Sequence, residues 1–377
     1  MGAARGSGAG PASEQALLVL NAGSSSLKAA LISPEDQILW REHWDMDGAA
    51  PSEQPQSPEA VLERRLVPRL SRGRARLSLV GHRFVHGGSR FHAPTRLDAE
   101  ACAVLEALVP LAPLHHGPAL RVMRWMQHWR RDLNQWACFD TAFHHTLPPA
   151  AHTYALPARW RALGLRRFGF HGLNHQHVSE VVRMQMASGA DPGLPAAPLL
   201  LISCHLGAGC SLCAIRDGVS IATTMGYTPM EGLVMASRSG SLDPGVLFEL
   251  LRRGISPAEL ERDLNAASGL LGLSGLSGSM KDLRQAAATG HPGAHLAIAV
   301  FHARLLEGIG AMAASLGGVD VIALTGGIGE NDGDLKEALR RDLSWLPPHR
   351  LLVVPADEEG VIARSCRSAE QRWCRNA

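Results

Sequence analysis

Short apolar runs that alternate with polar, glycine-containing turns dominate the pattern of this chain. The first apolar run covers residues 17–20, the polar stretch Asn21-Ala-Gly-Ser-Ser-Ser follows, and a second apolar run covers residues 27–32. Apolar runs of this length between turn residues are typical of buried strands, so the pattern predicts a β-hairpin. A P-loop is excluded, because its Gly-x4-Gly-Lys-Ser/Thr spacing and its following helix are missing.

The turn of this hairpin carries backbone N–H groups, serine hydroxyls, the Asn21 amide and, just beyond, the Lys28 ammonium. Groups of this kind can hold a phosphate chain and its metal ion. An ordinary serine-rich hairpin turn is the alternative that the turn alone leaves open.

The same pattern returns near the middle of the chain. The apolar run at 199–202 leads into Cys204-His205-Leu-Gly-Ala-Gly209, and a second apolar run ends at Ile215. Two copies of a strand–glycine turn–strand unit, each at the start of a domain, predict an internal duplication with a nucleotide between the halves. A chance similarity of two hairpins is the alternative.

Three further expected strands end in residues that can do chemistry. Arg83 lies at the end of the strand expected from residue 77, Asp140 follows the strand expected at 136–139, and His171 follows a strand expected at 166–170. Ligands collect at the carboxyl ends of strands in open α/β sheets, so these are candidate site residues. A surface arginine, a turn-forming aspartate and a structural histidine are the alternatives.

Glycines and small residues mark two more candidate binding segments. Arg238 lies among small residues in the long irregular stretch 223–244, and with Arg83 it offers two planar guanidinium groups for phosphoryl oxygens. The apolar run at 321–325 opens into three glycines ahead of a helix expected from about residue 334, an arrangement that suits a phosphate or a ribose. The spacing does not fit GxGxxG, which disfavours a Rossmann dinucleotide site.

The remaining segments predict helices and connections. Helices are expected at 59–70, 119–130, 176 onward, 246–253, 257–265 and 294–316, with a short one after residue 359. Polar, Pro-rich or Gly-rich stretches at 45–57, 111–118 and 191–198 are expected to be loops or linkers. Residues 1–14 are rich in Gly, Ala and Ser without an apolar core, which predicts a disordered leader and not a signal peptide.

Composition narrows the class of protein. The chain has 377 residues, of which 46% are hydrophobic and 19% charged, as expected for a globular enzyme of two domains. Its net charge of +2 gives no broad electrostatic attraction to nucleic acid or membrane, and no apolar run approaches membrane-spanning length. Only Lys28, Lys281 and Lys336 are lysines, which hints at sites that need a compact ammonium.

The seven cysteines are an odd number spread along the chain, which argues against a disulfide framework and for a reducing, cytoplasmic location. Cys210 and Cys213 form a CxxC with Cys204 and His205 just before it. A zinc or redox site there is disfavoured, because no second CxxC follows and the local pattern is that of a strand.

Taken together, these segments resemble the acetate and propionate kinase family of the sugar kinase, heat-shock protein and actin superfamily. The matching motifs run in order from residue 17 to near the C-terminus. They are Asn21-Ala-Gly-Ser-Ser-Ser-Leu-Lys28, His82-Arg83 with Val85-His-Gly-Gly, Leu111-Ala-Pro-Leu114-His115, Phe139-Asp140-Thr-Ala-Phe-His144, Phe170-His171-Gly, Cys204-His205-Leu-Gly, Thr228-Pro229-Met-Glu-Gly, Arg238 with Gly240-Ser-Leu-Asp243-Pro, and Thr325-Gly-Gly-Ile-Gly-Glu-Asn331.

The resemblance implies an α/β fold of two duplicated actin-like ATPase (ribonuclease H-like) domains with the active site in a cleft between them. The domains are expected at 15–150, joined by the C-terminal helix 360–377, and at 151–359, which would hold the nucleotide site and a homodimer interface. The implied reaction is Mg2+-dependent, reversible phosphoryl transfer from ATP to acetate, giving acetyl phosphate and ADP; Mn2+ is an alternative metal. No nucleic acid or membrane partner is expected.

The resemblance also implies roles for residues of this chain. Asn21 and Glu358 would hold the metal. The catalytic set would be Arg83, Asp140, His171 and Arg238, with Arg83 also binding substrate. The pocket for the methyl group would be lined by Val85, Leu114, Phe170 and Pro229. The nucleotide would contact Lys28, His205, Leu206, Gly207, Ala208, Gly209, Ser279, Met280, Lys281, Gly327, Ile328, Gly329, Glu330 and Asn331.

The chain departs from the family pattern in the nucleotide pocket. A Gly-Asn-Gly turn appears as Gly207-Ala208-Gly209, and an Asp-Phe-Arg type motif appears as Ser279-Met280-Lys281. These losses predict weaker or less selective binding of the phosphoryl donor, with GTP or another donor as an alternative to ATP. The sequence also leaves open propionate or butyrate as the acceptor, and a non-catalytic, nucleotide-sensing actin-like protein in place of an enzyme.

Overall fold

The computed structural model describes residues 15–23, 26–46, 56–73, 75–187 and 198–376, so the expected leader and most of the loops at 45–57 and 191–198 lie outside the described residues. The chain forms two compact units. The first comprises Met1–Gly87, Ala93–Phe139 and Glu359–Ala377, and the second comprises Gly88–His92 and Asp140–Glu358. These units divide after Phe139 and after Glu358, whereas the sequence placed the domain boundaries after residues 150 and 359.

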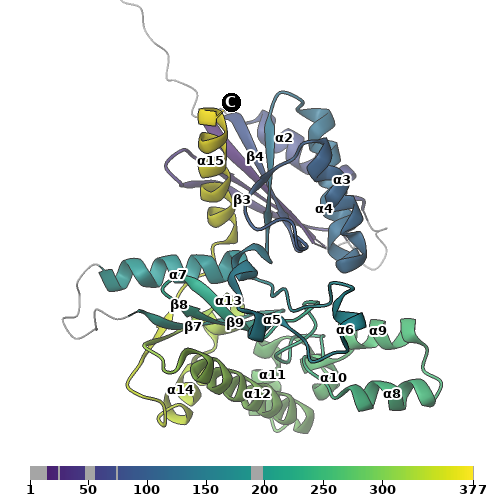
Figure 1. Cartoon of the computed structure of the whole chain (residues 1–377), viewed down its shortest axis with the longest axis vertical. Helices are drawn as coiled ribbons and strands as arrows, with labels where there is room; N and C mark the ends of the chain where they lie inside the picture. The colour runs from purple at the N-terminus through teal and green to yellow at the C-terminus, as the bar shows by residue number, and fades with distance from the viewer. Residues whose placement is uncertain (1–14, 24–25, 47–55, 74, 188–197, 377) are drawn as a thin grey trace, which may run out of the picture. The chain divides into compact units, whose positions relative to one another are not determined.

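The first unit is built on a six-stranded sheet of order β3-β2-β1-β4-β6-β5. Strands β3 and β4 of this sheet are labelled in Figure 1. Its strands are β1 (Gln15–Ala22), β2 (Ser26–Ile32), β3 (Ile38–Asp45), β4 (Arg76–Phe84), β5 (Thr95–Arg96) and β6 (Asn134–Phe139). β1 and β2 are antiparallel with Asn21 opposite Lys28, which confirms the predicted hairpin. β4 runs parallel to both of its neighbours, β1 and β6.

The second unit repeats this plan in a five-stranded sheet of order β11-β10-β7-β8-β9. Its strands are β7 (Leu200–Leu206), β8 (Cys210–Arg216), β9 (Val219–Thr223), β10 (Val321–Thr325) and β11 (Arg350–Val353). In both sheets the first strand of an antiparallel meander is followed by two parallel strands, and in the first sheet the short antiparallel β5 lies beyond them. This shared topology supports the duplicated α/β fold expected from the sequence.

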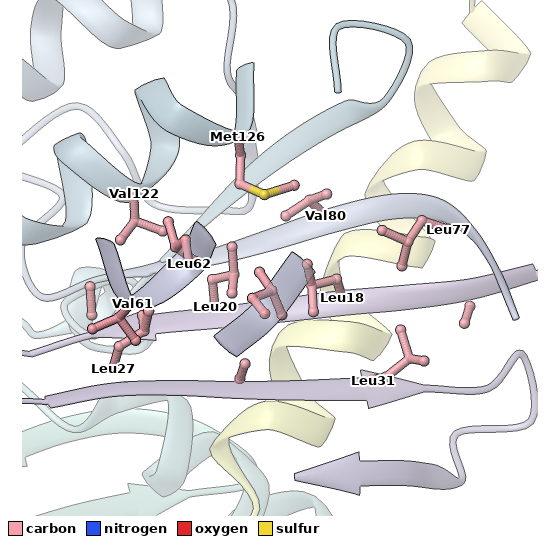
Figure 2. Close-up of a cluster of buried hydrophobic side chains, with 14 of the residues drawn as sticks. Leu18, Leu20, Leu27, Leu31, Val61, Leu62, Leu77, Val80, Val122 and Met126 are labelled. Carbon is pink, nitrogen blue, oxygen red and sulfur yellow. The ribbon is translucent and has the colours of Figure 1, made fainter. Parts of the chain in front are cut away.

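Helices cover both faces of the first sheet. They are α1 (Pro58–Val61), α2 (Val67–Ser71), α3 (Ala99–Ala107), α4 (Pro113–Trp129) and α15 (Glu358–Asn376), with a π-helical segment at Leu62–Leu66. Leu18 and Leu20 of β1 pack with Leu62, Val122 and Met126 in the cluster shown in Figure 2. A Cβ on Gly81 of β4 would lie 2.7 Å from Ile362 Cγ2 of α15, so that helix covers the opposite face. Burial on both faces explains why β1 is apolar without alternation.

The second sheet is likewise enclosed by helices. They are α5 (Pro149–His152), α6 (Ala158–Arg161), α7 (Gly172–Ala187), α8 (Pro244–Arg252), α9 (Pro257–Ala266), α10 (Gly269–Ser274), α11 (Met280–Ala288), α12 (Pro292–Leu316), α13 (Gly326–Asn331) and α14 (Gly333–Asp342). On one face, Val178 and Val182 of α7 pack with Ile215 of β8. On the other, a Cβ on Gly308 of α12 would lie 2.7 Å from Leu212 Cδ1 of β8. The alternating residues of β8 therefore contact different helices.

Several predicted boundaries are wrong. The segment 166–170 forms no strand but a single bridge from Arg166 to Thr153, and α7 begins at Gly172, ahead of residue 176. α4 begins at Pro113, so His115 and His116 lie in a helix and not in a loop. The glycines after β10 belong to the short helix α13, and the last helix is long, with 19 residues.

The apolar helix α12 corrects another expectation. With 25 residues and a mean hydropathy of 1.5 in its most apolar window, it is long and apolar enough to cross a membrane, although no run of that length was expected from the sequence. It is the one helix of this kind in the described part of the chain. Its Phe301, Leu305 and Ile309 are buried in the core of the second unit, and 33% of its most apolar window is buried.

Candidate active site

Two predicted site residues meet in the first unit at the carboxyl ends of neighbouring parallel strands. Asn21 lies at the end of β1 and is 6% exposed, and Arg83 of β4 donates from Nη1 to its Oδ1 over 3.3 Å. Lys28, paired with Asn21 in the β1–β2 register, is exposed. Val85 follows β4, whereas the side chain of Leu114 lies outside the described residues. Asn21 and Arg83 thus form a polar pair at a strand edge, where ligands bind in α/β folds.

In the second unit, Asp140, the residue after β6, is hydrogen-bonded to the first residue of α7. The N–H of Gly172 donates to the carbonyl of Asp140 over 2.8 Å. A Cβ on Gly172 would lie 2.2 Å from that oxygen, so only glycine allows this approach. His171 adopts a left-handed φ of 56°, which is unusual for a residue other than glycine and typical of functional sites. Asp140, Phe170 and His171 are therefore brought together.

His171 and Arg238 meet at Gly209, between β7 and β8. A Cβ on Gly209 would lie 3.1 Å from His171 Nε2 and 3.3 Å from Arg238 Nη2. Arg238 Nη1 donates to the carbonyl of Pro229 over 2.7 Å, which fixes the guanidinium. Burial lowers the pKa of Arg238, but a guanidinium stays charged in proteins. An imidazole and a cation thus face the same glycine, an arrangement that can receive a phosphoryl group.

Four polar side chains that the sequence analysis did not assign support this histidine. Ser211 Oγ lies 2.9 Å from His171 Nδ1 and 2.8 Å from His175 Nε2, and Ser203 Oγ lies 2.8 Å from His175 Nδ1. Asn174 Nδ2 donates to His205 Nδ1 over 2.9 Å. The rings of His171 and His205 are stacked with centroids 4.2 Å apart. The signal in the sequence was the closeness of Asn174 and His175 to His171: both lie in the first turn of α7, and His175 N donates to the carbonyl of His171 over 2.9 Å.

A cavity of about 960 Å3 in the second unit gathers many of the predicted nucleotide residues. Those that line it are Gly207, Ala208, Ser279, Met280, Lys281, Gly327, Ile328 and Asn331. His205, Leu206, Gly209, Gly329 and Glu330 are not among its lining residues. The Glu330 carboxylate instead accepts from Gly326 N and Ala356 N over 2.9 and 3.0 Å.

Local structure explains the altered motif in this cavity. Ser279 is the N-cap of α11, because its Oγ accepts from Asp282 N over 3.3 Å. Met280 is buried and Lys281 is exposed. Arg284, one turn further along α11, also lines the cavity, and its Nη2 lies 3.1 Å from Asp332 Oδ2. The sequence analysis missed Arg284, whose position three residues after Lys281 was the available signal.

Magnesium suits the donors that the resemblance assigned to it. Mg2+ is held in phosphoryl-transfer sites by one or two carboxylates together with substrate phosphates, so it needs no protein cage. Asn21 offers an amide oxygen, and Glu358, the first residue of α15, offers a carboxylate. Across the described ranges, no group of three His, Cys, Asp or Glu side chains is placed to hold a metal ion.

The two cysteines of the CxxC motif lie in β8, and their side chains are in the protein interior. Cys210 and Cys213 are fully buried, and burial raises the pKa of each thiol to about 12. Cys213 Sγ lies 3.3 Å from Ser220 Oγ, whereas Cys210 donates to the carbonyl of Gly207 over the same distance. Protonated, buried thiols of this kind behave as small apolar side chains.

Comparison with known proteins gives consistent similarities along the chain. A family model described as the acetokinase family matches residues 51–347. The acetate kinase of a Synechococcus species is 40% identical, in an alignment covering 94% of this chain and 99% of that protein. The crystal structure of Porphyromonas gingivalis acetate kinase is 30% identical with a TM-score of 0.82, covering 94% and 99% of the two chains. A propionate kinase from Francisella tularensis is 31% identical with a TM-score of 0.85 and the same coverage.

Proposed function

Because this chain belongs to the acetokinase family, we propose that it is an enzyme that reversibly transfers the terminal phosphoryl group of ATP to acetate, giving acetyl phosphate and ADP. The observation that carries the proposal is the approach of His171 and Arg238 to Gly209. The adjoining residues Gly207 and Ala208 line the large cavity, so this pair lies next to a space that can hold a nucleotide.

The chemistry of the acceptor explains why a site without a general base is sufficient for this phosphoryl transfer. A carboxylic acid with a pKa of about 4 to 5 is already ionised at neutral pH, so the nucleophile needs no general base. The barrier must then be lowered by in-line positioning and by neutralising charge on the moving phosphoryl group. Two arginines and a histidine meet these requirements without a proton-abstracting residue.

We assign the individual roles accordingly. Arg83 binds the acceptor carboxylate, and Arg238 and His171 donate to the phosphoryl oxygens. Asp140, which is 2% exposed, orients a cation or a metal-bound water and removes no proton. For contacts to the methyl group of acetate we keep the residues that the resemblance names: Val85, Leu114, Phe170 and Pro229. Asn21 and Glu358 would hold Mg2+, which when bound would neutralise charge on the donor phosphates.

An acid and donor panel tests the proposed function. In a hydroxamate assay of the full chain, we expect ATP and Mg2+ to convert acetate to acetyl phosphate faster than propionate or butyrate. Higher kcat/KM for propionate would assign the chain to the propionate branch, which the similarity to a propionate kinase keeps as the second candidate. Nucleotide binding without transfer to any short acid would contradict the proposal and favour a nucleotide sensor.

The altered cavity motif governs donor selectivity in this proposal. Lys281 stands where the family pattern has a guanidinium that could stack on a base, so that stacking contact is lost. Arg284 brings a guanidinium to the same cavity, but from a different position of α11. We therefore expect less discrimination among ATP, GTP and pyrophosphate than a dedicated adenine site gives. A strong preference for ATP in kcat/KM would refute this expectation.

Replacing Arg284 with alanine should raise the KM for ATP about fivefold and leave kcat nearly unchanged, because a partly exposed cation–ligand contact contributes about 1 kcal/mol. Steady-state kinetics at saturating acetate would measure this. Arg340→Ala is the matched control, since Arg340 is an exposed residue of α14 that pairs with Glu337. Equal KM values for wild type and Arg284→Ala would remove Arg284 from the donor site.

We also propose that the chain forms a homodimer in the cytoplasm. Several large apolar side chains of the second unit are solvent-exposed in the single chain: Leu242, Val246, Phe248, Leu251 and Leu296. Four of these five lie in or just before α8, and exposed apolar side chains gathered in this way are typical of protein interfaces. Light scattering of the purified chain would give the mass of a monomer if this proposal is wrong.

A further inference from the structure

A buried series of hydrogen-bonding side chains leads from the centre of the second sheet to His171. Ser203 of β7 contacts His175 Nδ1 at 2.8 Å, His175 Nε2 contacts Ser211 of β8 at 2.8 Å, and Ser211 contacts His171 Nδ1 at 2.9 Å. Ser203, His175 and Ser211 are fully buried. Only the last member of the series, His171, lies at the candidate active site.

The two serines cannot both donate to His175. Burial, with His144 and His205 nearby, lowers the pKa of His175 well below its ordinary value, so its ring is neutral. A neutral imidazole has one N–H donor and one nitrogen acceptor. Each ring nitrogen of His175 contacts a serine hydroxyl, so one hydroxyl must donate to the ring and the other must accept from it. The protonation of His175 therefore decides whether the hydroxyl proton of Ser211 points to His175 or is free to be donated to His171.

Ser203 selects the direction. Among the residues that the structure describes, His175 Nδ1 is the one hydrogen-bond partner of its hydroxyl. If Ser203 accepted from His175, its own buried proton would have no acceptor, which is costly. Ser203 therefore donates to Nδ1 of His175, the Nε2–H of His175 donates to Ser211, and the hydroxyl of Ser211 donates to Nδ1 of His171.

We propose that Ser211, His175 and Ser203 are positioning residues that hold His171 as the neutral tautomer with its proton on Nε2. That nitrogen is the one beside Gly209, where Arg238 also lies. The stacked ring of His205, itself fixed by Asn174, holds the plane of His171. The consequence for catalysis rests on the proposed function: His171 presents an N–H, and not a lone pair, to the phosphoryl oxygens.

The tautomer can be observed directly. Two-bond 15N–1H spectra of the full chain labelled with 15N-histidine, near pH 7, would report the protonation of each ring nitrogen, and His171→Gln would identify the His171 signals. In wild type we expect a bare Nδ1 and a protonated Nε2. In Ser211→Ala we expect a mixture of tautomers, and kcat should fall about two- to fivefold, in proportion to the lost Nε2–H population. Ser203→Ala should shift the mixture in the same direction.

Ser220→Ala is the matched control, because Ser220 Oγ lies 2.9 Å from Nδ1 of His144 outside this series. It should leave the His171 signals and kcat unchanged. A wild-type His171 protonated at Nδ1, or identical His171 signals in wild type and Ser211→Ala, would overturn the inference. A wild-type chain that transfers no phosphoryl group would overturn the proposed function instead, and the spectra would still decide the tautomer.

Discussion

Replacing Arg238 with alanine should lower kcat by about 100-fold or more, roughly 3 kcal/mol, with little change in the KM for acetate. The guanidinium is held beside His171 by its bond to the carbonyl of Pro229, so it is oriented before substrate binds. Charge on the phosphoryl group grows only as the reaction proceeds, and a residue that responds to that charge affects kcat more than binding. Steady-state kinetics with varied acetate at saturating ATP and Mg2+ would separate the two constants.

Two variants control this experiment. Arg216→Ala removes another arginine of the second unit that donates to a backbone carbonyl, that of Leu316 over 2.8 Å, and should leave kcat unchanged. Arg238→Lys keeps the charge but loses the planar fork, so it should recover only part of the rate. A loss in Arg238→Ala that is confined to KM would mean that Arg238 binds the ground state and does not stabilise the transition state.

Much of the fold was accessible from the sequence because its strands are buried on both faces. Such strands appear as continuous apolar runs, and both hairpins, at residues 17–32 and 199–215, were predicted in this way. The failures have a different physical origin. Residues 166–170, Arg-Arg-Phe-Gly-Phe, were expected to form a strand, but Gly169 needs a left-handed φ of 77° and the N–H groups of Phe168 and Gly169 donate to the carbonyl of Gly226. Tertiary contacts there replaced the strand that local composition favoured.

The residues of the candidate site likewise fall into those that the sequence indicated and those that it did not. Arg83, Asp140 and Gly209 could be found as candidates because each lies at or next to an end of a strand that the apolar pattern predicts, where the backbone leaves the sheet. Ser203 and Ser211 lie inside strands, where a serine between apolar residues has no distinctive pattern. Their role depends on His175, a helical residue that precedes Ser203 by 28 residues and Ser211 by 36. Sequence order does not show that such residues meet, so only the three-dimensional arrangement identified them.

Adding side-chain atoms at Gly209 should reduce activity in steps. A Cβ there would lie 3.1 Å from His171 Nε2 and 3.3 Å from Arg238 Nη2, closer than the usual contact distance of about 3.5 to 4.0 Å. Gly209→Ala must therefore displace both side chains by a few tenths of an ångström, and the branched side chain of Gly209→Val must displace them further. We expect kcat to fall about tenfold in Gly209→Ala and about 100-fold or more in Gly209→Val, because small misplacements of catalytic groups cost large factors in rate.

The comparison that isolates this effect uses a glycine without such neighbours. A Cβ on Gly310 of α12 would meet only Trp345, at 3.8 Å, so Gly310→Ala should keep full activity. The thermal midpoint of Gly310→Ala should stay close to that of wild type. The Gly209 variants should lose no more than overpacking costs, about 1 to 3 kcal/mol, since the backbone of Gly209 has no φ that excludes other residues. Equal kcat values for wild type and Gly209→Val would show that His171 and Arg238 do not act together at this glycine. A graded loss of kcat with an unchanged KM for ATP would instead place the reacting phosphoryl group against Gly209, between the imidazole and the guanidinium.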